Sequence, residues 1–315
     1  MTFNPKLNAL TLQELQASAN KQYGETPELL EASLKDLKTW LTKSPHLHSI
    51  QQDDKTLEMF LRGCKFSLER TKEKLDTFHS IKGTLPEWFD DWDPFNPIIQ
   101  EFLSSGVYLP LPGYDKKGRC VVLCQVGKIN TAKVNLNDIL KTVNMVVTTA
   151  IDGDRQTMVQ GFVTIQDMEG VGLGHVSLFD FSTMKKLITM VETAWPLKPK
   201  AEHVLNMPSL MENMHNMIQG MMKQKMRDRT HVHKNGNLDK LHEDIGLEIL
   251  PVEYGGSNGT IEELTRYWKK KVEDNRSNLM RLSQFKTDEA KRPGKPKLHS
   301  DLFGIEGSFR KLDID

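Results

Sequence analysis

The sequence is poor in cysteine and has no long apolar run. Only three of its 315 residues are cysteines, so a complete set of disulfides is impossible. No Cys-x-x-Cys pair and no His/Cys spacing of a zinc site occurs. The N-terminus lacks the apolar segment of a signal peptide, and no run approaches the ~20 residues that a membrane-spanning helix needs. We therefore expect a reduced, cytoplasmic protein without a bound metal.

An excess charge of one sign is also missing. The 42 lysines and arginines balance 42 aspartates and glutamates. A chain with zero net charge has no overall field that draws it to nucleic acid or to a membrane, so any such attraction must come from a local patch. We expect no nucleic-acid partner.

Signatures of enzymes are absent as well. The stretch E-G-V-G-L-G-H, with Gly170, Gly172 and Gly174, is similar to a dinucleotide-binding turn. That turn needs a helix starting at its last glycine and an acid about twenty residues later, where this chain has Trp195-Pro196. No phosphate-binding lysine loop and no G-x-S-x-G elbow is present. We predict no catalytic residue and no cofactor, and a glycine loop that serves mobility or close packing.

Two histidines alternate on a predicted strand. His231 and His233 therefore share a face, but the spacing places no third ligand beside them. We interpret them as structural. Cys120 and Cys124 likewise share one face of a predicted strand, and we expect buried thiols there.

What the sequence has in excess is methionine, concentrated in one segment. Seven of the fifteen methionines recur at steps of three and four together with Leu210 and Ile218, which lays one apolar stripe along a helix. Methionine is flexible and polarisable, so such a stripe can repack around an irregular apolar guest. On the residues alone, a core face and a face that meets a ligand or partner both stay open. The seven are Met207, Met211, Met214, Met217, Met221, Met222 and Met226.

Cations follow this helix. Lys225 and Arg229 are four residues apart and share a helical face. Lys198 and Lys200 precede the strand before the helix, and an α/β fold brings such positions close. Two interpretations stay open, a solvated surface and a pocket for phosphorylated headgroups.

The order of patterns predicts the architecture. The first ninety residues read as helices, with a Thr11/Glu14 capping box, a start at Thr26-Pro27 and a helix from Ser67 to Gly83. A segment with three prolines then marks a boundary. Strands alternating with helices follow, which indicates the α/β class with a largely parallel sheet. We predict strands at 119–126, 161–168 and 201–206, around His231 and near Ile249, and helices at about 137–151, 182–194 and 260–282.

We divide the chain into a helical domain (1–92), an α/β domain (93–256) and a C-terminal helix and tail (257–315). The tail is rich in Lys, Pro and Gly but ends with apolar residues. We expect these residues to dock onto the rest of the protein. They are Leu302, Phe303, Ile305 and Phe309.

Several motifs in order resemble one family. They are T-L-E-M-F-L-R-G-C-K-F-S-L-E-R-T-K-E-K-L, a strand ending in D-M-E-G, W-P-L-K-P-K-A-E-H-V-L-N-M-P, K-M-R-D-R-T-H-V-H and L-P-V-E-Y-G-G. Together they look like the CRAL-TRIO lipid-binding proteins, within the branch of alpha-tocopherol transfer protein and cellular retinaldehyde-binding protein. The resemblance spans about residues 11 to 283.

The resemblance implies one apolar molecule held between the sheet and a mobile helical lid, the methionine helix. The implied cavity residues are Val143, Val147, Leu187, Met190, Val191, Trp195, Met211, Met214, Ile218 and Met222. A basic cleft for phosphatidylinositol phosphates is implied at Lys198, Lys200, Lys225 and Arg229. Cys64 and Glu73 stand where the family has basic residues, which weakens the N-terminal side of that cleft.

The resulting prediction is a carrier without covalent chemistry. It binds a retinoid, a tocopherol or a similar isoprenoid and meets anionic membranes transiently as a peripheral protein. Two alternatives are a phosphatidylinositol or phospholipid exchange protein and an adaptor that senses lipid without transferring it.

Overall fold

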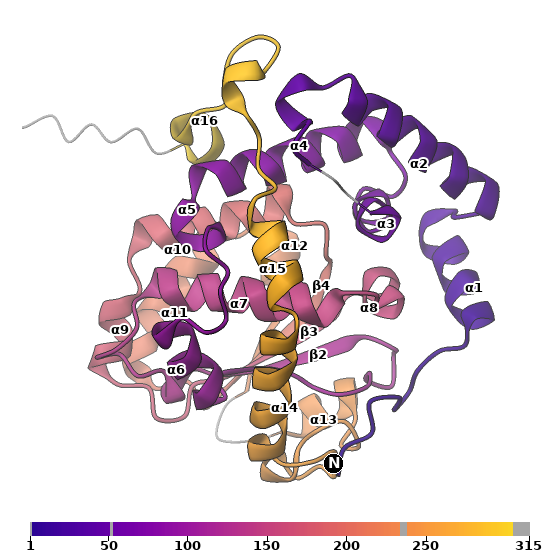
Figure 1. The fold of residues 1–315 in the computed structure, drawn as a ribbon. Coiled ribbons are helices and arrows are strands. Elements are labelled where there is room, and N and C mark those ends of the chain that lie inside the picture. The colour runs from indigo at the N-terminus through magenta and orange to yellow at the C-terminus, as the bar shows by residue number, and fades with distance from the viewer. Residues whose placement is uncertain (1, 51–52, 234–237, 305–315) are drawn as a thin grey trace, which may run out of the picture.

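The computed structural model describes residues 2–50, 53–233 and 238–304. An N-terminal helical region precedes a mixed sheet with helices around it, as predicted (Figure 1). None of the helices in these ranges is both long enough and apolar enough to cross a bilayer.

Three of the four N-terminal helices begin at a residue whose side chain caps the helix. Thr11 and Glu14 form the predicted capping box of α1. The Thr26 side chain accepts from the Leu29 amide at the start of α2. The predicted helix after Ser67 is also present and ends one residue later than expected. The bounds are α1 Leu12–Tyr23, α2 Pro27–Thr42, α3 Asp54–Gly63 and α4 Leu68–Thr84, with a 3-10 turn at Pro45–Leu47.

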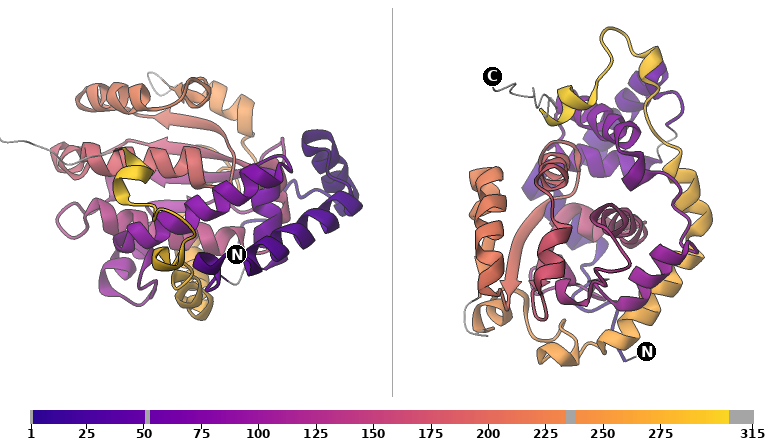
Figure 2. Two further views of the ribbon diagram at one scale, coloured as in Figure 1. Left: turned by 90° about the horizontal axis from the view of Figure 1, so that it is seen from above. Right: turned by 90° about the vertical axis from the view of Figure 1, so that its left-hand side faces the viewer.

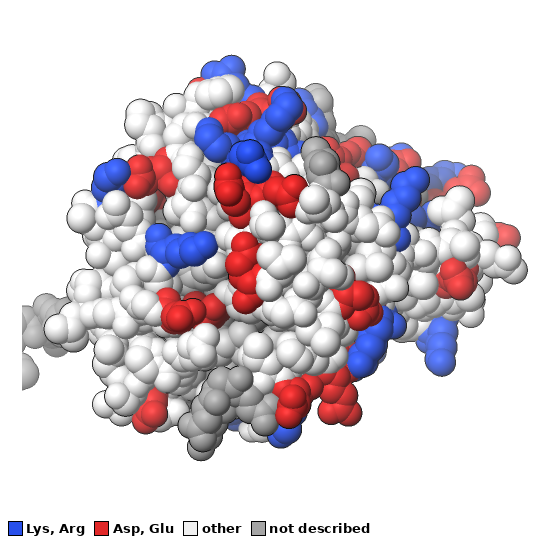
Figure 3. All heavy atoms as spheres, turned by 90° about the horizontal axis from the view of Figure 1, so that it is seen from below, with Lys and Arg blue, Asp and Glu red and all other residues white. Residues whose placement is uncertain are grey.

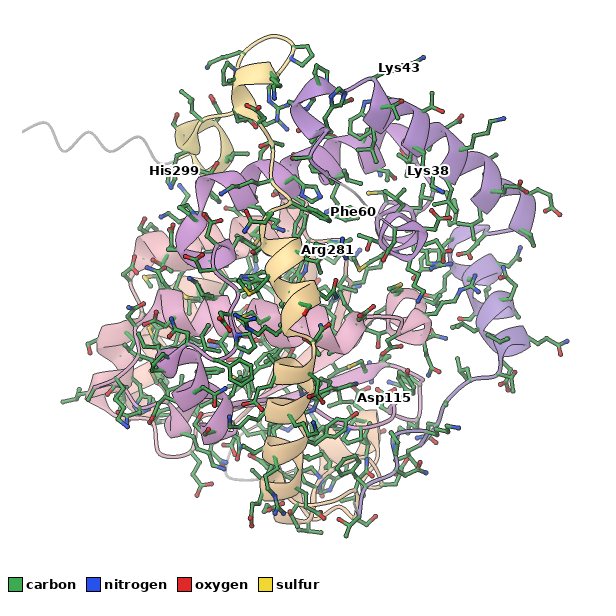
Figure 4. All side chains as sticks on the ribbon, in the orientation of Figure 1. Lys38, Lys43, Phe60, Asp115, Arg281 and His299 are labelled. Atoms are coloured by element: carbon green, nitrogen blue, oxygen red, sulfur yellow. The ribbon has the colours of Figure 1, made fainter. Side chains whose placement is uncertain are left out.

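These helices pack on the rest of the protein. Phe60, labelled in Figure 4, lies edge-on to Phe78 of α4 with ring centroids 5.6 Å apart. Their apolar cluster also contains Val147, Met158 and Leu197 from the sheet region. A buried ion pair adds to this packing, because Arg62 of α3 donates to both carboxylate oxygens of Glu25 at 2.7 Å.

A five-stranded sheet has the order β1-β2-β3-β4-β5. Strands β2 to β5 run parallel, as predicted, and β1 is an antiparallel edge that the sequence pattern did not reveal. The bounds are β1 Tyr108–Pro110, β2 Cys120–Gln125, β3 Phe162–Asp167, β4 Pro199–Leu205 and β5 Thr230–Val232.

Helices connect the parallel strands. Before the sheet come α5 Pro86–Phe89 and α6 Pro97–Ser105. Between strands lie a 3-10 turn Val126–Lys128, α7 Leu136–Ile151, α8 Arg155–Gln160, α9 Leu173–Leu178, α10 Phe181–Thr189, a π-helical turn Met190–Ala194, α11 Ser209–Met221 and α12 Gln224–Arg227. After β5 come α13 Asp239–Ile245, a 3-10 turn Val252–Tyr254, α14 Ile261–Asp274, α15 Arg276–Ser283, a 3-10 turn Glu289–Lys291 and α16 His299–Phe303.

Three predicted elements differ. The methionine helix is interrupted, because α11 ends at Met221 and Met226 lies in the separate helix α12. The strand expected near Ile249 is wrong, because Ile249 and Leu250 lie in a buried turn. A short apolar run has the same pattern in a buried turn as in a buried strand. The single helix expected over 260–282 is two helices, since Asn275 ends α14 and precedes α15. These two form a column on the side of the molecule opposite α11 (Figure 2).

The C-terminal segment docks as predicted up to residue 304. Phe303 is 2% exposed, and α16 contacts α4 and α10. Asp76 of α4 holds the segment through Arg292 at 2.7 Å and Lys297 at 2.9 Å. The predicted contacts of Ile305 and Phe309 lie outside the described residues.

Candidate functional site

The two faces of the sheet differ in exposure. Along β3, Val163, Ile165 and Asp167 are buried, whereas the alternate residues Phe162, Thr164 and Gln166 keep partial exposure. On β2, Cys120 and Cys124 share the second face, as predicted, and are also partly exposed. Burial nevertheless raises the pKa of both thiols to about 12. The thiols are thus strongly desolvated without being fully enclosed by protein atoms.

Helices α7 and α11 pack over this partly exposed side. One apolar cluster joins Tyr108, Cys124 and Val204 of the sheet to Val143 of α7 and to Met211 and Met214 of α11. We call this side of the sheet the α11 face and define it by Tyr108, Cys120, Cys124, Phe162, Thr164, Gln166, Glu202 and Val204. The opposite face meets α13, where His203 lies 3.1 Å from Asp244.

The ten predicted cavity residues fall into several groups. Val143 belongs with Met211 and Met214, and Val147 packs in the same cluster as Trp195. Leu187, Met190 and Ile218 belong to the main core. Val191 and Met222 are partly exposed and belong to no buried cluster of the described residues.

A π-helical turn separates α10 from Trp195. It spans Met190–Ala194, and such turns are rare and often occur at functional sites. The Trp195 ring lies 6.2 Å from Phe162, at one end of the α11 face. Lys74 of α4 donates to the carbonyl oxygens of Thr193 and Trp195, so the N-terminal helices fix this turn.

Four predicted cations meet where β4 begins. Lys198 and Lys200 flank Pro199, whose carbonyl oxygen accepts a hydrogen bond from Arg229. Lys225 lies close enough to both lysines to lower their pKa values. We call Lys198, Lys200, Lys225 and Arg229 the cationic cluster.

Lys198 is the most constrained member of the cluster. Its ammonium lies 3.9 Å from the centroid of the Tyr23 ring and donates to the Arg62 carbonyl oxygen. Burial, followed by the charges of Lys200 and Lys65, lowers the Lys198 pKa to about 7. An anion placed here would restore its charge.

Further cations lie beside the cluster, and the sequence analysis missed two of them, Lys65 and Lys74. Lys65 acts on Lys198, and Lys223 acts on Lys74. Lys65 and Lys74 adjoin Cys64 and Glu73 in the sequence, and they supply charge where those two residues do not. Glu192 offsets Lys223 with an ion pair of 3.4 Å.

His233, His203 and Asp244 form a hydrogen-bonded row. His203 lies 2.9 Å from His233 and 3.1 Å from Asp244, which also pairs with Arg119 at 3.0 Å. Asp115, labelled in Figure 4, holds the other side of Arg119. In the described parts of the chain, no group of three or more His, Cys, Asp or Glu side chains is arranged so that it could hold a metal ion.

The glycine loop packs closely only in part: a side chain on Gly174 would meet Thr131 Oγ1 at 2.7 Å, whereas one on Gly172 would meet nothing within 4 Å. A side chain on Gly127 would meet the Glu169 carbonyl oxygen at 1.8 Å, so a glycine is required opposite the loop. An open pocket of about 660 Å³ lies here, at the carboxyl ends of β2 to β4. The buried carboxylate of Asp167 lines this pocket. It already accepts hydrogen bonds from the Tyr254 hydroxyl, the Asn206 side chain and the Glu169 backbone amide.

Exposed apolar side chains lie on α9, α10 and α11, and the two on α11 belong to the predicted methionine stripe. Leu173 starts α9, Phe181 starts α10, and Leu210 and Met217 lie on α11. All four are exposed large apolar side chains. On the face seen in Figure 3, charged side chains are sparse on the side of α9 and α11.

Comparisons with known proteins agree with this architecture. Residues 104–256 match the CRAL/TRIO domain, and residues 26–99 match the Pinta-like UBA domain. Human alpha-tocopherol transfer protein-like is 28% identical over 253 residues, which cover 80% of this chain and 73% of that protein. Human clavesin-2 is 26% identical over 249 residues, covering 76% and 72%. The crystal structure of Sfh5 shares the fold with a TM-score of 0.50 at 14% identity, covering 79% of this chain and 91% of Sfh5.

Proposed function

Since the chain carries a CRAL/TRIO domain at residues 104–256, we propose that it binds one hydrophobic lipid between the α11 face of the sheet and helices α7, α10 and α11. The observation that carries this proposal is the partial exposure of Cys120 and Cys124 in surroundings that strongly raise their thiol pKa values. From this combination of desolvation and accessibility we infer that the two side chains border the space that the lipid fills. The apolar side chains of Val143, Met211 and Met214 adjoin that space.

In this proposal α11 is the mobile cover. Most of its inward residues are methionines, which adapt to irregular guests. Met214 and Ile218 keep partial exposure on its inner side. Movement of α11 opens the α11 face, and the exposed Leu173, Phe181, Leu210 and Met217 bring this region against a membrane.

The bound molecule is of the retinoid, tocopherol or isoprenoid kind. The name of the relative alpha-tocopherol transfer protein-like supports this choice. A phosphatidylinositol or other phospholipid exchanger is the second candidate, favoured by the cationic cluster beside the Trp195 end of the α11 face.

Extraction of lipid from the protein purified from its natural source, followed by mass spectrometry, tests the proposal. A carrier of isoprenoids yields one such molecule per chain, and an exchanger yields a phospholipid. Protein that carries no lipid and binds none from a panel of both classes contradicts the proposal.

The cationic cluster makes a separate prediction. Lys225→Ala with Arg229→Ala is expected to slow lipid transfer to vesicles containing phosphorylated phosphatidylinositol roughly thirtyfold, because each basic side chain near an anionic surface contributes about 1 kcal/mol. The difference should shrink in high salt, which screens exposed charges. Fluorescent lipid transfer measures the rate. Lys38→Ala on α2 with Lys43→Ala at the C-terminal cap of α2 (Figure 4) is the charge-matched control. Equal slowing by this control pair would mean that overall charge alone is responsible.

The lowered pKa of Lys198 predicts that the protein takes up a proton when it binds an anion. The pKa of about 7 in the free protein rises when an anion binds, because the anion favours the charged ammonium. Binding of soluble inositol trisphosphate at pH 8 should therefore take up about one proton, and much less at pH 6, where Lys198 is already charged. Titration calorimetry in two buffers of different ionisation enthalpy measures this uptake. Lys198→Met should abolish the uptake and Lys225→Met should keep it; uptake unchanged in Lys198→Met excludes Lys198 as the site.

A further inference from the structure

Glu202 stands at the middle of the α11 face. It lies on β4, directly opposite Thr164 of β3 and Thr230 of β5. Side chains alternate along a strand, so Glu202 points to the same side as Val204, which packs with Met211 of α11. An acidic side chain thus lies on the α11 face, between the polar Thr164 and Thr230 and close to the apolar Val204.

The contacts of Glu202 leave part of its carboxylate unused. Gln166 Nε2 donates to one oxygen at 2.5 Å, and the Thr230 hydroxyl donates to the other at 2.9 Å. A carboxylate accepts about four hydrogen bonds. Glu202 is partly exposed, and no ion pair with it occurs among the described residues, so two acceptor positions remain open toward the α11 face.

This arrangement is unfavourable while those positions have no donor. Burial raises the pKa of Glu202, which reflects the cost of a carboxylate in apolar surroundings. A strand interior is also a poor place for glutamate. A donor supplied by a bound molecule would offset this cost.

Thr164 makes the site more specific. Its side chain is partly exposed on the same face, one strand away from Glu202, and its hydroxyl has no hydrogen-bond partner within the described residues. Neighbouring strands are about 4.8 Å apart, so one small group on a ligand reaches both side chains. A carboxylate accepts only, whereas a threonine hydroxyl also donates.

The pair therefore suits a hydroxyl group, which donates and accepts at once. An ammonium could donate to both Glu202 and the Thr164 oxygen, but it has no lone pair to accept the Thr164 hydroxyl proton. It would also enter next to Lys200 and Arg229, which lie at the start of β4 and before β5 and repel a cation.

We propose that Glu202 and Thr164 form a subsite that selects an uncharged lipid alcohol, with the ligand hydroxyl donating to Glu202 and accepting from Thr164. Gln166 and Thr230 hold the Glu202 carboxylate in place. This inference rests on the proposed lipid-binding function and specifies the polar end of the ligand.

Matched pairs of probes test the subsite. Retinol, α-tocopherol and geranylgeraniol are each compared with their methyl ethers, which keep the shape and lose the donor. The protein is expected to bind at least one alcohol roughly 10- to 100-fold more tightly than its ether, the usual effect of a hydrogen bond to a charged group. In Glu202→Ile the preference should fall to about onefold, while Glu212→Gln, on the exposed side of α11, should keep it.

Thermal unfolding shows whether the variant is folded. Glu202→Ile is expected to be at least as stable as the natural chain, because it removes a buried charge that has no cationic partner. Glu202→Gln provides a second, nearly isosteric variant with an intermediate preference.

The outcomes distinguish failure of the hydroxyl subsite from failure of the carrier function. Equal binding of alcohols and ethers, or a preference that survives in both Glu202 variants, overturns the hydroxyl subsite and leaves the carrier function intact. Failure of the natural chain to bind any of the six probes or a phospholipid overturns the carrier function, and the subsite with it.

Discussion

Replacement of Met214 and Ile218 by aspartate is expected to abolish binding of apolar lipids. Both side chains lie on the inner side of α11, next to the sheet and the main core. Two carboxylates directed toward a hydrocarbon guest would be strongly unfavourable, with an expected affinity loss of at least a hundredfold. Fluorescence titration with retinol, α-tocopherol and a labelled phospholipid measures the loss.

The same helix offers a control of equal charge. Asn213 and Asn216 are exposed on α11, so Asn213→Asp with Asn216→Asp adds two carboxylates to its outer side. This variant should bind lipid normally. Unchanged affinity in the Met214/Ile218 variant would exclude α11 as the cover, and an equal loss in both variants would assign the effect to the stability of the helix.

Removal of the Arg62 guanidinium is expected to cause the largest loss of stability, about 3–5 kcal/mol. Arg62 is fully buried and bonds to Glu25 at 2.7 Å and to Glu58 at 2.9 Å. Arg62→Ala leaves the fully buried Glu25 carboxylate without its main partner. Denaturant unfolding gives the change in the free energy of unfolding.

A weaker neighbour and a double variant serve as controls. Arg155 reaches the same two acids only at 3.6 and 3.9 Å and is 42% exposed, so Arg155→Ala should cost less than about 1 kcal/mol. Neutralising both partners, by Arg62→Met with Glu25→Gln, should recover much of the loss. A cost below about 1 kcal/mol for Arg62→Ala would mean that this pair does not hold the N-terminal helices.

Sequence patterns correctly predicted the helices and strands that are determined by residues near one another in the chain. Thr11 and Thr26 cap their own helices through neighbouring amides, and the apolar alternation of β3 requires only that one face be buried. Sequence patterns were insufficient for the elements that depend on contacts between residues far apart in the chain. The three-residue strand β1 exists because Leu109 lies opposite Leu123 in the sheet. Ile249 is buried by the core without entering a strand.

The sequence by itself determined the kind of protein this is. Its repeating methionines, its cations after the methionine helix and its ordered motifs indicated the domain, since each depends on residues near one another in the chain. The placement of Lys198 beside Lys65 and Tyr23 depended on the tertiary structure. So did the environment of Glu202, because its accepted hydrogen bonds come from other strands. Burial and the proximity of charges arise from segments that meet only in the folded chain, so the chemistry of the site follows from the tertiary structure.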